Sequence, residues 1–160
     1  QNVAFGLRAR GVAKKEREET SSHYIREVGL SGFENKYPHQ LSGGMRQRTG
    51  LARALTVNSD ILLMDEPFSA VDEQMRRKLQ EDLLHLLKIE SKTVIFVTHS
   101  IEEAVYLADQ VVILSGRPGS VADIVYPEID RAGEIDLIRR QPGYIELVDE
   151  IWSSLKSYVE

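Results

Sequence analysis

The sequence predicts an α/β protein in which a small helical subdomain precedes a parallel sheet. Beyond residue 57, short apolar runs alternate with amphipathic helical patterns, an order typical of strands joined by crossover helices. These runs are Ile61–Met64, Val94–Val97 and Val111–Leu114. They are apolar at every position, as expected of parallel strands buried on both faces. Residues 1–57 instead carry apolar residues at helical spacing, which predicts the helical subdomain.

Glycines and a serine mark the ends of the predicted N-terminal helices. Apolar residues at helical spacing precede Gly11 and Gly29. Glycine readily adopts the left-handed conformation that ends many helices, so both positions predict helix ends. Ser42 can cap a further helix, which we expect to continue to Asn58.

The elements after residue 57 follow from the same patterns. Residues Glu73–Ile89 predict a helix with one apolar face, formed by Met75, Leu79, Leu83 and Leu86,. Residues Ile101–Leu107 predict the next helix. The segment Arg117–Pro127 predicts a Gly/Pro turn flanked by one or two edge strands.

The C-terminal part predicts two closing helices, over residues 134–140 and 142–158. The second has an apolar stripe of Ile145, Val148, Trp152 and Leu155, and we expect Trp152 to be a core anchor. The predicted organisation is therefore a helical subdomain over residues 1–57, the α/β core over residues 58–130, and closing helices over residues 131–160.

Composition limits the class of protein. The 160 residues are 42% hydrophobic, enough for one domain with a sizeable core, and the net charge of -5 argues against nucleic acid as a partner,. There is no cysteine, so no disulfide framework or thiolate metal site is expected. No apolar run approaches a membrane span, and the chain begins with neither an initiator Met nor a signal peptide,. It is therefore expected to be cytoplasmic and a piece of something longer.

The segment Leu41–Arg48 combines a helix cap with two glycines. Gly43 and Gly44 directly follow Ser42, at the start of the predicted helix. Backbone N–H groups at a helix start have no partner within the helix, and with the helix dipole they can hold a phosphate. An isolated Ser-Gly-Gly is more often an ordinary capped turn, so these three residues alone do not establish a site.

Two adjacent carboxylates close the first apolar run. Asp65 and Glu66 stand at the carboxyl end of the predicted strand, where open parallel sheets bind ligands,. Phosphoryl transfer to water needs a magnesium ion and a group that orients the water, and two carboxylates can divide these tasks. The competing interpretation is helix capping at a strand exit.

Asp72 and His99 each have a structural interpretation beside a functional one. Asp72 precedes the helix from Glu73 and is a plausible N-cap. His99 follows the second apolar run, which places it on the same sheet edge as Asp65 and Glu66. Ser100 and Glu103 predict a capping box beside His99, which would explain the local turn without chemistry. His23, His39 and His85 lack partners at metal-ligand spacing and are expected to be surface or packing residues,.

Three motifs together resemble one family, the nucleotide-binding subunits of ATP-binding-cassette (ABC) transporters. They are Leu41–Arg48, Ile61–Pro67 and Thr93–His99. The resemblance implies an incomplete P-loop NTPase (RecA-like) α/β core with an N-terminal ABC helical subdomain, ATP and Mg2+ as cofactors, and ATP hydrolysis that powers solute import. Further segments are most similar to the nitrate, sulfonate and taurine importer branch: Phe68–Gln74, Glu102–Asp109 and Leu114–Gly119.

The resemblance also implies a role for each candidate residue. Ser42, Gly43 and Gly44 would contact the γ-phosphate of an ATP held by a second copy. Asp65 would hold Mg2+ and Glu66 would polarise the attacking water. The resemblance further implies that His99 contacts the γ-phosphate, while Gln47 and Asp72 contribute to nucleotide binding at the interface. The family more often has Leu where Val71 stands, which is a conservative change. Asp is common in the family where Ser100 stands, and both residue types cap helices.

No G-x-x-x-x-G-K-[ST] phosphate loop occurs in the 160 residues,. The adenine-stacking aromatic residue and the glutamine loop of the family are absent as well, which implies a fragment or a truncated gene product without ATPase activity of its own. The complete subunit would pair head to tail with a second copy, bind transmembrane permease subunits at the inner face of the membrane, and act with a solute-binding protein.

Two other classes of function stay open. A soluble ABC ATPase that acts on DNA or ribosomes often carries coiled-coil insertions or two cassettes, and this acidic chain shows neither. A non-catalytic module could retain the half-site for dimerisation or regulation, which the residues do not exclude.

Overall fold

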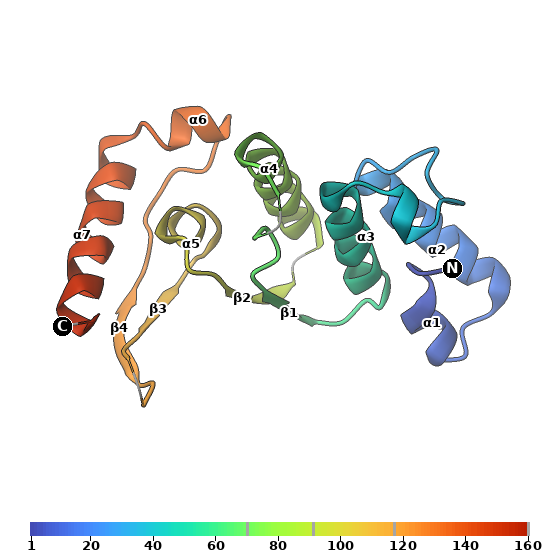
Figure 1. The fold of residues 1–160 in the computed structure, drawn as a ribbon, viewed down its shortest axis with the longest axis horizontal. Helices are drawn as coiled ribbons and strands as arrows, with labels where there is room; N and C mark the ends of the chain where they lie inside the picture. The colour runs from blue at the N-terminus through green and yellow to red at the C-terminus, as the bar shows by residue number, and fades with distance from the viewer. Residues whose placement is uncertain (70, 91, 117, 160) are drawn as a thin grey trace. The chain divides into compact units, whose positions relative to one another are not determined.

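The computed structural model describes residues 1–69, 71–90, 92–116 and 118–159 of the chain (Figure 1). It divides into two compact units, Gln1–Ile95 and Phe96–Glu160. The first unit contains α1 (Phe5–Ala9), α2 (Lys14–Glu27), the short 3-10 helix η1 (Pro38–Gln40), α3 (Gly43–Thr56), β1 (Ile61–Asp65), α4 (Glu73–Glu90) and the start of β2 (Thr93–Val97). The second contains the end of β2, α5 (Ile101–Leu107), β3 (Val111–Leu114), β4 (Val121–Val125), α6 (Ile135–Ile138) and α7 (Pro142–Val159).

The helical part of the first unit packs around α3. Helices α1 and α2 both contact α3, and Val28 at the end of α2 and Leu55 in α3 are buried. Thr56 is fully buried, and its hydroxyl donates to the carbonyls of Val3 (3.0 Å) and Arg53 (2.8 Å). The predicted helix ends are confirmed, because α1 and α2 are each followed by a glycine in the left-handed region, at φ +74° for Gly11 and +67° for Gly29.

The strands of the first unit are covered on one face only. The predicted apolar face of α4 is confirmed, since Leu79, Leu83 and Leu86 are all buried. β1 pairs with β2, and its side chains alternate between buried and exposed. Leu63 is 76% exposed, so the prediction that these strands are buried on both faces is wrong for the described residues. The cause is that no described element of this unit covers the second face.

The second unit contains a separate sheet. β3 pairs antiparallel with β4, with Val111 opposite Val125 and a register shift between Ile113 and Leu114. The predicted edge strand within residues 117–127 is confirmed as β4, while Arg117 lies outside the described residues. The prediction that Val111–Leu114 is a parallel strand buried on both faces is wrong, because β3 pairs antiparallel with β4 and its alternate residues are exposed. The described strands form two two-stranded sheets, β1–β2 and β3–β4.

Arg131 caps the C-terminal end of α5. Its guanidinium donates to the carbonyl of Tyr106 at 2.7 Å, and also to the carbonyls of Val105 and Ala108. The last carbonyls of a helix have no intrahelical donor, and a cation at that end is favoured by the helix dipole. The Arg131 side chain is only 14% exposed. A residue 25 positions beyond Tyr106 thus completes the hydrogen bonding at the end of α5.

Helix α7 packs on α5 with a different face from the one predicted. Tyr144 and Ile151 are buried, and the Tyr144 hydroxyl donates to the carbonyl of Glu102 at 2.9 Å. Trp152 is 53% exposed, with the Lys156 ammonium 5.3 Å from its ring, so its predicted core position is wrong. Two apolar stripes, offset by one residue, share α7, and hydrophobic periodicity does not decide which one faces the core.

Tyr144 makes the second unit sensitive to alkali. Burial raises the pKa of Tyr144 to about 12 from 10.0, so the folded state holds this proton more tightly than the unfolded chain does. Stability from this group is full below pH 10 and is lost as the pH rises toward 12,. We expect Tyr144→Phe to reduce the fall in denaturation midpoint across this interval. Circular dichroism melts of both proteins check this, and an identical fall in the two would contradict it.

Candidate functional site

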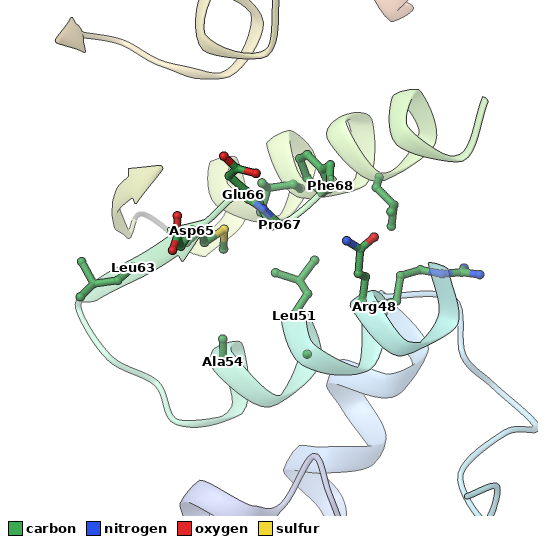
Figure 2. Close-up of a pocket in the computed structure, with 13 residues that line it drawn as sticks. Arg48, Leu51, Ala54, Leu63, Asp65, Glu66, Pro67 and Phe68 are labelled. Carbon is green, nitrogen blue, oxygen red and sulfur yellow. The ribbon is translucent and has the colours of Figure 1, made fainter. Parts of the chain in front are cut away.

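A cavity of about 340 Å3 lies within the first unit, between α3 and the segment that follows β1 (Figure 2). Three of the predicted site residues line it: Gln47, Asp65 and Glu66. The rest of its lining is mainly apolar, and Leu51 extends from α3 into the space. The cavity thus brings the helix that starts with the glycine pair close to the two carboxylates.

The backbone fixes the direction of the Glu66 side chain. Glu66 has φ +43°, a conformation that is rare outside glycine, and it immediately precedes Pro67,. The N–H and hydroxyl groups of Ser69 both donate to the Glu66 carbonyl, at 3.2 and 3.0 Å. Phe68 is buried and anchors this turn. Strained residues of this kind persist where the surrounding structure holds them. The carboxylates of Asp65 and Glu66 are exposed at the end of β1 and the start of this turn.

The start of α3 has the predicted cap. The Ser42 hydroxyl accepts a hydrogen bond from the Met45 N–H at 3.2 Å, and the Arg46 N–H donates to the Ser42 carbonyl at 3.0 Å. Gly43 and Gly44 form the first turn, where backbone N–H groups have no intrahelical acceptor,. Ser42 is exposed, so this turn can present N–H groups and a hydroxyl to an anion,.

Asp72 caps α4, as predicted. Its carboxylate accepts from the Met75 N–H at 3.0 Å, while Arg76 donates to the Val71 carbonyl at 3.3 Å. Asp72 is exposed and is not among the residues that line the cavity. Ala70, which belongs to the same predicted motif, lies outside the described residues. The capping role is confirmed, and the interface role of Asp72 stays a prediction.

His99 belongs to the second unit, where a hydrogen-bond relay shapes its turn. The Ser100 hydroxyl accepts from the Glu103 N–H at 3.3 Å, which is the first half of the predicted capping box. The return half runs through Thr98: the Ser100 N–H donates to the Thr98 hydroxyl at 3.0 Å, and that hydroxyl donates to the Glu103 carboxylate at 2.6 Å. His99 is exposed between these bonded neighbours. Its predicted proximity to Asp65 and Glu66 stays a prediction.

The sequence pattern did not indicate Thr98 as part of this turn. The hydroxyl of a threonine two positions before the cap residue Ser100 can take the place of the Ser100 N–H as donor to the Glu103 carboxylate. The presence of Thr98 at that position is the signal that could have indicated the relay. Glu103 is 6% exposed, and burial strengthens hydrogen bonds to a carboxylate.

A second hollow, of about 350 Å3, lies in the helical part of the first unit. Its lining includes Ile25, Leu30, Phe33, Tyr37 and Leu41. Phe33 is 43% exposed and Tyr37 is 67% exposed, so aromatic surface faces outward here. No motif in the sequence pointed to these residues as a contact surface.

The two carboxylates at the end of β1 are candidate ligands for a metal ion. Among residues 1–69, 71–90, 92–116 and 118–159, no three His, Cys, Asp or Glu side chains are grouped as metal ligands. Mg2+ commonly uses one or two carboxylates and completes its shell with phosphate oxygens and water. Asp65 and Glu66 therefore fit an ion that arrives with a nucleotide. Within the described part of the chain, no helix is both long and apolar enough to cross a membrane.

The chain is similar to ABC proteins in both sequence and structure. The family model described as ABC transporter matches residues 1–69. An uncharacterised ABC transporter ATP-binding protein of Methanocaldococcus jannaschii is 47% identical over 98% of this chain and 60% of its own length. The taurine import ATP-binding protein TauB of Rhizobium johnstonii is 45% identical over 98% of this chain and 61% of its own length. The nitrate import ATP-binding protein NrtD of Synechocystis is 40% identical over 98% and 60%.

A solved ATP-binding cassette supports the fold. It is a dimer in a post-hydrolysis state bound to ADP and Pi, and it matches at 32% identity and a TM-score of 0.62 over 73% of this chain and 50% of that cassette. The predicted P-loop NTPase class is thereby confirmed. The chain is similar to ABC transporter ATP-binding proteins over 98% of its length, and its similarity to TauB and NrtD agrees with the predicted importer branch. It spans about three fifths of the length of the curated relatives that it matches.

Proposed function

We propose that this chain is part of an ATP-hydrolysing subunit that powers solute import by an ABC transporter. The observation that carries the proposal is the end of β1, where the exposed carboxylates of Asp65 and Glu66 line the cavity of the first unit, while the capped Ser42 turn is a separate exposed helix start outside that lining. Two carboxylates and a helix start that can hold phosphate are the groups that phosphoryl transfer needs. Relatives named for taurine, nitrate and glycine betaine transport support import as the process.

Each residue is assigned a separate task. Asp65 would hold Mg2+, which when bound would gather charge on the β and γ oxygens of ATP. Glu66 would accept a hydrogen bond from the attacking water and orient it, and His99 would contact the γ-phosphate. The remaining assigned residues contribute to nucleotide binding: Ser42, Gly43, Gly44, Gln47 and Asp72.

The active unit is proposed to be a head-to-tail dimer. Each ATP would lie between the phosphate loop of one copy and the Ser42 turn of the other, so the Ser42 turn and Glu66 of one chain serve different nucleotides. The solved dimeric cassette supports a dimer of this family. Of the three predicted parts, residues 1–57, 58–130 and 131–160, the first would contact the permease subunits of the transporter.

Permease subunits in the membrane are the proposed second partner. The hollow with Phe33 and Tyr37 on its surface would take a short apolar segment of the permease, because exposed aromatic groups beside a hollow favour apolar contacts,. The subunit would then work at the inner face of the membrane, together with a solute-binding protein.

The test of this function is a pair of mixed dimers. It uses a subunit that joins these 160 residues to the phosphate-loop segment of a relative. Ser42→Arg and Glu66→Gln homodimers are both expected to be inactive. Mixing the two variants should restore one intact site, because the Ser42 and Glu66 that serve it come from different copies that are each unaltered there. Phosphate release from purified mixed dimers measures this.

The control places both substitutions in one copy and pairs it with an unaltered copy. The proposal expects no intact site in this dimer, since each site then carries one lesion. Activity in the control together with inactivity in the complementary mixture would show that Ser42 and Glu66 serve the same nucleotide. Inactivity of the unaltered fusion despite ATP binding would contradict the ATPase assignment itself.

A further inference from the structure

The two glycines at the start of α3 have different surroundings. Gly44 is buried, whereas its neighbour Gly43 is half-exposed. A Cβ atom built on Gly44 would lie 3.1 Å from Met75 Cγ and 3.6 Å from both Met75 Sδ and Val71 Cγ1. At Gly50, in the same helix, a Cβ would meet nothing within 4 Å. Gly44 is therefore in close contact with α4 and the segment before it.

Backbone conformation does not explain the glycine at position 44. It lies inside a regular helix and is not among the described glycines with positive φ. The close approach of Met75 is the constraint that the structure shows. Met75 and Val71 stand on either side of Asp72, the cap of α4, so one packed block joins the first turn of α3 to the first turn of α4.

We infer that Met75 is a positioning residue for the turn formed by Ser42, Gly43 and Gly44. Its side chain packs against Gly44, where the absence of a Cβ leaves room for it, and it thereby couples the turn to the loop that ends at Asp72. The distances alone establish the packing of Met75 on Gly44, while the relevance of this packing to a nucleotide rests on the proposed function. In a dimer the two segments would approach a ligand as one body.

Alanine substitutions of the two glycines test the contact in the chain as it exists. Alanine has the higher helix propensity, so Gly50→Ala should raise the melting temperature by about 2–4 °C. Gly44→Ala should give no gain or a loss, because Met75 must move. In a Met75→Ala background the same Gly44→Ala change should become stabilising, since the obstructing Cγ is gone. A gain from Gly44→Ala equal to that from Gly50→Ala, with Met75 intact, would overturn the inference.

Hydrogen exchange separates positioning from general stability. The amides of Met45 and Arg46 are bonded to the Ser42 hydroxyl and carbonyl. Met75→Ala should speed their exchange about 10-fold more than exchange in the last turn of α3, because the loss of packing is local. Met75→Leu, which keeps the bulk, should leave both rates near those of the unaltered chain. Equal acceleration at the two ends of α3 would overturn the inference.

The outcomes stay separable from those of the proposed function. Restored stability in the Gly44→Ala, Met75→Ala double variant supports the contact even if the mixed dimers fail. If Gly44→Ala and the double variant are equally destabilised, the contact is not the constraint at position 44, whatever the mixed dimers show.

Discussion

Glu66→Gln is expected to reduce ATP turnover by about 10²- to 10⁴-fold in a subunit that joins this chain to a phosphate loop. The change removes the carboxylate charge that would polarise the attacking water and keeps the shape of the side chain. The strained turn should survive, because its hydrogen bonds from Ser69 are made to the Glu66 carbonyl. ATP binding should therefore persist, and the dimer should accumulate in its ATP-bound form.

Steady-state phosphate release and nucleotide retention after gel filtration measure these two expectations. Gln74→Glu is a suitable control, since Gln74 is exposed in the first turn of α4 and has no assigned role. Turnover near that of the unaltered subunit in the Glu66→Gln variant would show that another group orients the water. Loss of ATP binding would instead indicate that Glu66 holds the nucleotide or its metal.

The isolated 160-residue chain is expected to self-associate in solution and to lack ATPase activity. Leu63 is 76% exposed, and Ile61 and Ile95 are each more than half exposed in the same unit. In the second unit, Leu114 is 63% exposed. Apolar surface of this kind is seldom left in water, so association or element exchange between copies should cover it. No phosphate loop is present to hold ATP in reach of Glu66,.

Light scattering over a range of concentrations tests the association. Leu63→Lys should lower the average mass toward the 18.1 kDa of one chain, because an ammonium on the exposed face opposes its burial. Gln74→Lys adds the same charge at an exposed polar site and should leave the mass unchanged. A monomeric, stably folded chain would contradict the association. Magnesium-dependent turnover that Glu66→Gln removes would contradict the predicted inactivity.

Local physical rules account for the features that could be predicted from the sequence. The caps at Ser42 and Asp72 depend on a side-chain oxygen three residues before an N–H, and both are present as predicted,. The glycine helix ends at Gly11 and Gly29 depend on a single backbone torsion,. The order and spacing of the motifs were enough to predict the class of protein. The glycine pair, the two carboxylates and His99 follow one another as they do throughout a family, so this prediction did not depend on any single contact.

Features that depend on neighbouring elements were not predictable in the same way. Apolar runs show that a strand suits a buried sheet, but they do not show which faces are covered in this chain, as the exposed Leu63 demonstrates. Trp152 was misplaced because α7 carries two adjacent apolar stripes, and the hydrogen bond from Tyr144 to Glu102 belongs to the one that packs. The Gly44–Met75 contact joins residues on different helices, and no local pattern in the sequence indicates it.

The way in which α5 is capped has a consequence for how the protein is made. A ribosome releases α5 well before the residues that complete it: Arg131 follows Tyr106 by 25 positions, and Tyr144 follows Glu102 by 42. Domains fold as units once their parts have emerged during synthesis. The second unit therefore cannot reach its final hydrogen bonding until Tyr144 has emerged, and a nascent chain halted before Tyr144 would leave the helix next to His99 open to proteases and chaperones.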